Sequence, residues 1–195
     1  MSIEIQHLSK TFFPGTSREH KALKHVSLSI QEGDFITIVG GNGAGKSTFL
    51  NAIAGNFSLD EGTISFGGHQ IEHTADFERA AYISRVFQDP MQGTAPRMTV
   101  AENLALANRR GQKRSLFKTS SKEELQQFEA LLAPLGLGLE DRLHTEIGLL
   151  SGGQRQAISL LMATMNAPQL LLLDEHTAAL DPKTQRKIMQ KTQET

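Results

Sequence analysis

The sequence predicts an α/β fold with a mainly parallel sheet, and two stretches carry this expectation. Apolar residues 34–39 run into a glycine-rich stretch, 40–48, and a helical pattern follows over 47–54. Residues 170–173 are consecutive leucines followed by carboxylates, which is typical of a strand buried inside a parallel sheet. Residues 89–158 change to a helical character, so we expect a helical lobe inserted into the α/β core.

The glycine-rich stretch matches G-x-x-x-x-G-K-[ST], the P-loop pattern that cradles nucleotide phosphates. Glycine lets the backbone wrap closely around an anion, and the free N–H groups that open the next helix favour negative charge. Lys46 is expected to reach the β- and γ-phosphates, and Ser47 to ligate Mg²⁺. A glycine-rich turn without a ligand is the alternative, and the flanking strand and helix patterns disfavour it. The residues expected to bind ATP here are Gly40, Asn42, Gly43, Ala44, Gly45, Lys46, Ser47 and Thr48.

The N-terminal region predicts a small antiparallel sheet. Apolar and polar residues alternate over 3–8 and 26–30, which is typical of half-buried strands, and 63–72 has the pattern of a hairpin. Phe12 and Phe13 follow the first strand. Either ring could stack on a nucleobase, but the local sequence alone favours an ordinary core or edge aromatic side chain.

A second anion site is expected at residues 150–154, Leu-Ser-Gly-Gly-Gln. Ser151 and Gln154 form an S-x-x-Q capping box, and the glycines between them leave the start of the helix bare of side chains. The alternative is an ordinary capped helix followed by chance glycines. Similar boxes predict helix starts after Thr99 and Ser121, in the helical lobe.

Two carboxylates follow the leucine run. Ligands bind at the carboxyl ends of parallel strands, so Asp174 is expected to face the P-loop and hold Mg²⁺. Glu175 is expected to orient and polarise the attacking water. A strand-terminal acidic turn is the alternative, and the P-loop upstream, which needs such a partner, disfavours it.

Composition excludes several classes of protein. The 195-residue chain has a formal net charge of −1 and a pI of about 6.7, which gives no electrostatic case for binding nucleic acid. Without cysteine it has no disulfide or cysteine-ligated metal, and a cytosolic chain is expected. No apolar run reaches the roughly 20 residues of a membrane span, so a membrane role would come through a partner. The basic segment 109–122 either contacts anionic lipid or, the favoured reading, forms a solvated loop.

The P-loop, residues 150–154 and the strand 170–174, in this order, closely resemble the nucleotide-binding subunit of ABC transporters over essentially the whole chain. The resemblance implies a P-loop NTPase core, with residues 40–48 as Walker A and 170–174 as Walker B. It implies that Glu175, Gln88 and Lys46 are catalytic, and that Ser47, Gln88 and Asp174 are Mg²⁺ ligands. It also implies that Phe12 stacks on adenine and that Asp181 lies in the D-loop. The signature that contacts a partner's ATP would consist of Ser151, Gly152, Gly153 and Gln154.

The resemblance also implies a mechanism and partners. Two subunits, as a homodimer or pseudo-dimer, would close head to tail around two ATP molecules with Mg²⁺. Closure would drive transmembrane permease subunits, and the chain would lie on the cytoplasmic face of the membrane, held there by those subunits. We expect one ABC ATPase domain over residues 1–195, with a core of 1–88 and 159–195 and a helical lobe of 89–158.

One departure concerns the end of the sequence. The family's switch histidine lies about thirty residues beyond the catalytic glutamate, and the sequence ends at Thr195. We therefore expect a C-terminally truncated chain that hydrolyses ATP poorly.

A narrower resemblance points to one kind of transporter. Residues 174–182, with Asp-Glu-His-Thr in place of Asp-Glu-Pro-Thr, and residues 87–96 are similar to bacterial importer ATPases assigned to tryptophan or tyrosine uptake. An importer of amino acids or other small solutes, with a substrate-binding protein, is the expectation. The alternatives are an exporter ATPase, a soluble ABC ATPase of repair or translation, and a nucleotide-binding module that does not hydrolyse.

Overall fold

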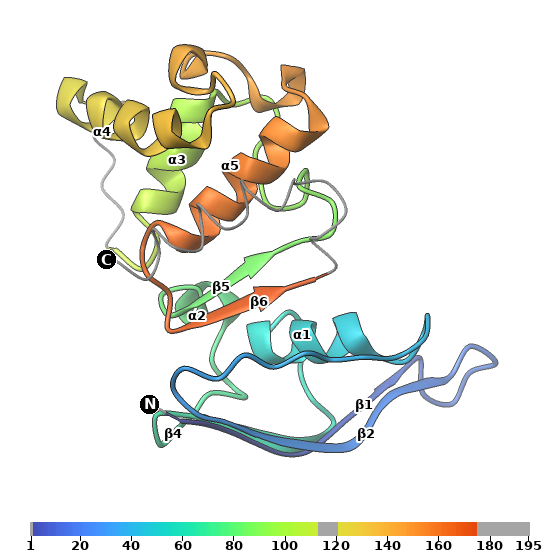
Figure 1. Ribbon diagram of the computed structural model, residues 1–195. Coiled ribbons are helices and arrows are strands. Elements are labelled where there is room, and N and C mark those ends of the chain that lie inside the picture. The colour runs from blue at the N-terminus through green and yellow to red at the C-terminus, as the bar shows by residue number, and fades with distance from the viewer. Residues whose placement is uncertain (1, 113–120, 175–195) are drawn as a thin grey trace. The chain divides into compact units, whose positions relative to one another are not determined.

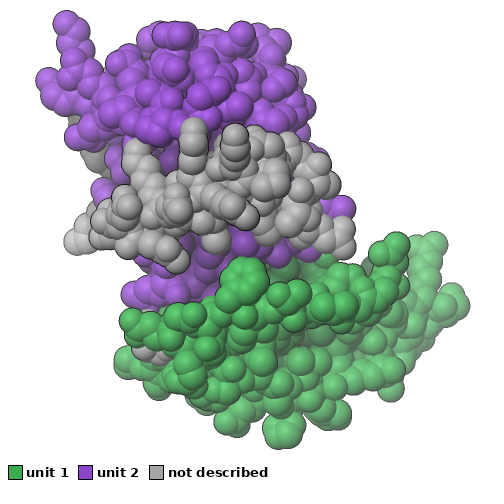
Figure 2. Space-filling view, in the orientation of Figure 1, with its two compact units in different colours: residues 1–79 green, residues 80–195 purple. Residues whose placement is uncertain are grey.

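The structure is a computed structural model that describes residues 2–112 and 121–174. The chain divides into two compact units, residues 1–79 and 80–195 (Figure 2). The expected division into a core and a lobe at residues 88 and 158 stays a prediction.

Unit 1 is built on an antiparallel sheet with the order β2-β1-β3-β4 (Figure 1). Its elements are β1 (Ile3–Phe12), β2 (His20–Ile30), α1 (Lys46–Ala54), β3 (Glu61–Phe66), β4 (His69–Gln70) and α2 (Asp76–Arg79). The sheet buries Ile5, Leu8 and Ile64, and α1 buries Phe49 and Ile53. The prediction of an N-terminal antiparallel sheet that includes the 63–72 hairpin is confirmed.

The strand expected at residues 34–39 is absent, and this prediction is wrong for the described structure. Phe35 is 83% exposed and Val39 89% exposed, instead of buried. An apolar run becomes a strand only where a neighbouring strand offers its backbone groups. In unit 1, β1 pairs with β2 and β3, and no strand pairs with 34–39.

Unit 2 combines a parallel strand pair with a helical region (Figure 1). Its elements are β5 (Ile83–Val86), α3 (Val100–Asn108), α4 (Lys122–Leu132), α5 (Gly152–Thr164), β6 (Leu170–Leu173) and three short 3₁₀ helices, Ala133–Leu135, Glu140–Arg142 and Ile147–Leu149. Its core joins Leu104 of α3, Phe128 of α4 and Ile158 of α5. Both the strand at 170–173 and the helical lobe are thus observed. Across residues 2–112 and 121–174, no helix is long and apolar enough to cross a membrane.

The capping residues predicted from the sequence are observed at the starts of α3 and α4. The Thr99 side chain accepts from the Glu102 N–H while the Glu102 carboxylate accepts from the Thr99 N–H, so the capping box of α3 is complete. Ser121 caps α4 by accepting from the Glu124 N–H. The predicted starts of both helices are confirmed.

A buried arginine holds α1 and α2 together in unit 1. Arg79 is 2% exposed, and its guanidinium donates to the carbonyls of Ala52 and Ile53 at the end of α1, at 3.1 and 2.9 Å. Its Nε also donates to the Thr74 carbonyl at 3.0 Å. The last carbonyls of a helix lack partners within the helix and carry partial negative charge, so a cation there both satisfies and stabilises them.

We therefore expect Arg79→Met to lower the free energy of unfolding by about 3 kcal/mol, because it removes the guanidinium donor from the Ala52, Ile53 and Thr74 carbonyls, of which Ala52 keeps the Gly55 N–H. Denaturant unfolding of the full chain measures the change. Arg18→Met is the matched control, since the Arg18 side chain is exposed and should cost less than about 0.5 kcal/mol. Equal losses in the two variants would contradict the assigned role of Arg79.

Candidate nucleotide-binding site

The glycine-rich loop of unit 1 leads directly into α1. Gly45 caps the helix at φ 86° without any side-chain hydrogen bond to the first turn, and Gly43 also has positive φ, 80°. A Cβ on Gly45 would lie 2.5 Å from the Ala22 carbonyl oxygen of β2, so only glycine fits. No side chain therefore caps the first N–H groups of α1, which suits an anion site.

Lys46 lies inside this loop. Its ammonium donates to the carbonyls of Gly40 and Gly41 at 2.8 and 3.1 Å. The side chain thus folds back over the loop that is expected to receive the phosphates. The remaining loop residues of the prediction, Asn42, Ala44, Ser47 and Thr48, lie in the same stretch, and Ala44 N–H closes a turn on the Gly41 carbonyl.

Phe12, the expected adenine-stacking ring, is the last residue of β1. Its ring meets Phe57 edge to face, with centroids 5.4 Å apart, and the Lys10 ammonium lies 5.8 and 5.6 Å from the two ring centroids. Phe13, the alternative ring, is 63% exposed. The sequence analysis missed Phe57, whose only signal is an aromatic residue just beyond Gly55, the glycine that ends α1.

Asp60 fixes the backbone next to Phe12. Its carboxylate pairs with Lys10 at 2.8 Å and accepts from the Thr11 N–H at 2.6 Å. The hydrogen bonds from Lys10 and from Thr11 hold the pKa of the Asp60 carboxyl below its ordinary value.

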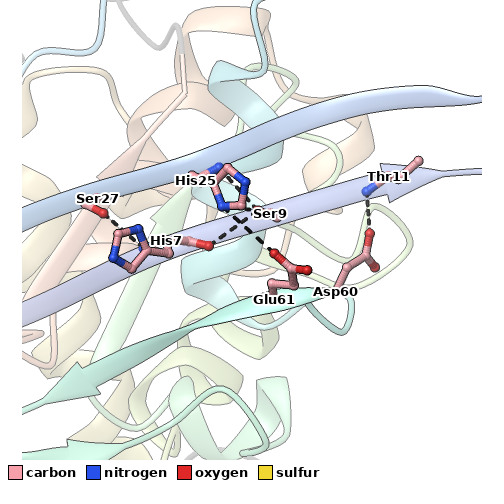
Figure 3. A network of polar contacts seen from close by, with 7 residues as sticks. All are labelled: His7, Ser9, Thr11, His25, Ser27, Asp60 and Glu61. Atoms are coloured by element: carbon pink, nitrogen blue, oxygen red, sulfur yellow. Dashed lines mark hydrogen bonds and ion pairs between the residues drawn. The ribbon is translucent and has the colours of Figure 1, made fainter.

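A network of polar contacts connects β1, the strand that carries Phe12, to its neighbours (Figure 3). The His7 N–H donates to the Ser27 hydroxyl at 3.0 Å, and the His25 N–H donates to the Ser9 hydroxyl at 3.2 Å. Both histidines have positive φ where the register between β1 and β2 shifts. A Cβ on Gly62 of β3 would lie 2.6 Å from the His7 carbonyl oxygen, so the strands approach closely at this irregularity.

In unit 2, the carboxyl ends of β5 and β6 bring together two expected Mg²⁺ ligands. Val86 pairs with Leu173, and the Asp174 N–H donates to the Val86 carbonyl at 3.1 Å. Asp174 therefore follows one strand where Gln88 follows the other. This end of parallel strands is where α/β folds place ligand-binding residues.

Asp174 has a partner that the sequence analysis missed. The Arg85 guanidinium donates to its carboxylate at 2.9 Å, and the two side chains are 10% and 11% exposed. Nothing in the local sequence pairs these residues, because the contact arises only when β5 lies beside β6.

The expected signature begins α5. The Ser151 hydroxyl accepts from the Gln154 N–H at 3.3 Å, and the Gln154 side chain accepts from the Ser151 N–H at 3.1 Å. The Gln154 amide also donates to the Leu137 carbonyl at 3.0 Å. A Cβ on Gly152 would have open space around it, and the start of the helix at Gly152 and Gly153 carries no side chain. The predicted capping box is confirmed.

The donor set predicted for Mg²⁺ is a hydroxyl at Ser47, an amide at Gln88 and a carboxylate at Asp174. Such hard oxygen donors suit this ion, and the Arg85 cation shows that the Asp174 carboxylate accommodates positive charge. Ser47 belongs to unit 1, and Gln88 and Asp174 belong to unit 2. Among the described residues, no group of three histidine, aspartate or glutamate side chains is placed to hold a metal. Glu175 and Asp181 lie outside the described residues.

A P-loop at a helix start without a side-chain cap, an aspartate after a parallel strand, and a capping box that encloses two glycines together define the class of ATP-binding cassettes. The family model of the ABC transporter matches residues 23–178. The chain belongs to the ABC transporter family, as an ATP-binding subunit.

Curated relatives agree with this family. The chain is 42% identical to a tyrosine transport ATP-binding protein of Clostridioides difficile, over 97% of this chain and 75% of that protein. It is 38% identical to a phosphonates import ATP-binding protein of Alcaligenes faecalis, over 96% and 67%. A spermidine/putrescine import ATP-binding protein of Bacteroides thetaiotaomicron is 36% identical, over 96% of this chain and 37% of that protein.

Solved structures show the same fold. A dimeric ATP-binding cassette in a post-hydrolysis state, bound to ADP and phosphate, matches with a TM-score of 0.79 at 32% identity, over 96% of this chain and 80% of that chain. A nucleotide-free cassette from an ABC transporter matches with a TM-score of 0.73 at 30% identity, over 100% and 77%. The predicted family and fold class are confirmed, and ATP binding and hydrolysis are the general activity of the family.

The geometry of the P-loop predicts that alanine destabilises the chain at Gly45 but not at Gly41. Gly45→Ala should lower the free energy of unfolding by more than 2 kcal/mol, because the new Cβ meets the Ala22 carbonyl at a positive φ. Gly41→Ala is the matched control, since Gly41 lacks positive φ and has open space around it. Thermal unfolding of both variants checks the difference. A Gly45→Ala chain as stable as Gly41→Ala would show that the loop conformation is different.

Proposed function

We propose that this chain binds and hydrolyses Mg²⁺·ATP and thereby powers a membrane importer of small solutes, with amino acids as the favoured class. The observation that carries the proposal is that two helices, α1 and α5, begin in glycine-rich stretches, a setting that favours the binding of an anion. In this arrangement the P-loop binds the ATP of its own subunit, and the site at the start of α5 binds a phosphate of another subunit's ATP. This supports a head-to-tail dimer.

Within this proposal each residue has a defined task. The loop of residues 40–48 cradles the phosphates, with Lys46 exchanging its carbonyl partners for phosphate oxygens. Ser47, Gln88 and Asp174 hold Mg²⁺, and the ion supplies positive charge to the β- and γ-phosphates. Gln88 and Glu175 orient the attacking water, with Glu175 as the polarising carboxylate. Ser151, Gly152, Gly153 and Gln154 contact the ATP of the partner subunit, and Asp181 lies in the D-loop.

Import and the kind of solute rest on the relatives. A tyrosine transport protein, a phosphonates import protein and a spermidine/putrescine import protein all match over most of this chain. Two of these names specify import and the third specifies transport, which supports an importer with transmembrane permease subunits and a substrate-binding protein at the cytoplasmic face of a membrane. A solved dimer among the relatives supports pairing of two cassettes.

The partners can be tested directly. Pull-down of the full-length protein in mild detergent, followed by mass spectrometry, should recover a multi-spanning membrane protein together with a solute-binding protein. Recovery of ribosomal or DNA-bound proteins without a membrane protein would overturn the transporter proposal and leave an ATP-driven dimer.

Glu175→Gln should trap an ATP-bound dimer, because the ligand still closes the interface while the water is no longer polarised. Light scattering with Mg²⁺ and ATP measures the mass. The companion variant Lys46→Ala should stay monomeric under the same conditions, since it lacks the phosphate contact. A monomer in the Glu175→Gln sample would count against the sandwich mechanism.

Phe12→Ala should weaken ATP binding about tenfold, because base–aromatic stacking contributes roughly 1–3 kcal/mol. Binding of inorganic tripolyphosphate should not change, since it has no base. Calorimetry measures both ligands. Phe13→Ala removes the adjacent, exposed ring and should leave both affinities unchanged. Equal losses for ATP and tripolyphosphate in Phe12→Ala would assign Phe12 a structural role.

A further inference from the structure

Arg85 forms a buried ion pair with Asp174, the expected Mg²⁺ ligand. A guanidinium nitrogen of Arg85 lies 2.9 Å from a carboxylate oxygen of Asp174, and both side chains are about nine-tenths buried. Arg85 is in β5 opposite Leu172 of β6, so the side chain reaches along the parallel pair to the residue that follows β6. The roles assigned above leave this arginine unexplained.

The same guanidinium is held from a second side by an aromatic ring. Its Cζ lies 4.5 Å from the ring centroid of Phe87, which is a cation–π contact. The ring in turn packs closely against Gly93, where an added Cβ would lie 3.3 Å from Phe87 and 3.2 Å from the Ser159 hydroxyl. Arg85 is therefore fixed between Asp174 and the residue that precedes Gln88.

A buried carboxylate requires a counter-charge, because removal from water penalises the ionised form. In this structure Arg85 supplies that charge. Mg²⁺ brings positive charge to the same carboxylate, and like charges at such short range repel one another strongly in a poorly hydrated site. The guanidinium and the metal thus stabilise the same anion in different states of the protein.

We propose that Arg85 is a built-in counter-ion and positioning residue for Asp174: it holds the carboxylate in place before the metal arrives and limits how much Mg²⁺ strengthens nucleotide binding. This inference rests on the proposed Mg²⁺-binding role of Asp174. Without Arg85, the carboxylate would lose the cation that pairs with it. With Asp174 at the nucleotide, as proposed, Mg²⁺ would then offset a larger repulsion between the carboxylate and the phosphates. The effect of Mg²⁺ on nucleotide affinity should therefore grow.

The experiment measures the dissociation constant of a non-hydrolysable ATP analogue, AMPPNP, in EDTA and in excess Mg²⁺. The ratio of the two constants reports the coupling between metal and nucleotide. In Arg85→Met this ratio should be about tenfold larger than in the wild type, within the usual range of coupling between two ligands. Arg109→Met is the control, because Arg109 pairs with Glu124 at 3.1 Å on the surface, with 46% of its side chain exposed. It should keep the wild-type ratio.

Asp174→Asn separates failure of this inference from failure of the proposed function. A collapse of the ratio toward one in Asp174→Asn, with a raised ratio in Arg85→Met, supports the inference. A collapse in Asp174→Asn with an unchanged or lowered ratio in Arg85→Met overturns the inference alone. A wild-type ratio in Asp174→Asn overturns the role of Asp174 and the inference with it.

Stability gives a readout that does not depend on turnover. Arg85→Met should lower the melting temperature of the nucleotide-free chain and recover most of the loss with Mg²⁺ and AMPPNP, because the ion replaces the missing cation. If Arg85→Met does not fold, Arg85→Gln retains a hydrogen-bond donor without the charge, and its affinity ratio decides by the same criterion. Arg85→Lys keeps the charge and should restore a ratio near that of the wild type.

Discussion

The proposed recognition of phosphate at a helix start constrains both units, because N–H groups of the first turn must stay accessible to the ligand. The two helices meet this constraint in different ways. At α1, Gly45 provides no side-chain cap, and Lys46 occupies the loop by bonding to its carbonyls. At α5, Ser151 and Gln154 cap each other's backbone groups while the glycines keep the surface bare. The start of α5 is thus held by bonds between its own residues, whereas in the proposed function ATP at α1 exchanges bonds that Lys46 makes with the loop.

Features set by neighbouring residues were predictable from the sequence. The caps of α3, α4 and α5 each involve residues three apart, and alternation alone was sufficient to place the N-terminal antiparallel strands. The fold class followed from the P-loop and the leucine strand, since each has a characteristic setting. The chemistry of the site was predictable to the same extent, because its residue types occur within short, recognisable stretches.

Features that depend on distant parts of the chain were not predictable. Arg79 meets carbonyls 26 and 27 residues away, and Arg85 meets Asp174 across 89 residues. Phe57 meets Phe12 only because β3 folds back beside β1. The strand expected at 34–39 failed for the same reason: an apolar pattern indicates that a segment can pair, but its partner is set by the rest of the fold.

Two charged residues of the proposed site have partners within their own units. Lys46 donates to the carbonyls of its own loop, and Arg85 neutralises Asp174 beside it. In the proposed function, binding of Mg²⁺·ATP replaces these hydrogen-bond and ion-pair partners with new ones. The net free energy of binding is therefore smaller than the contacts to the ligand alone suggest. In the proposed cycle of binding and release this arrangement is favourable, because both charges have partners within their own unit when the ligand leaves, so release costs less. On the inference about Arg85, the residue at position 85 thereby sets how much Mg²⁺ increases the affinity for nucleotide.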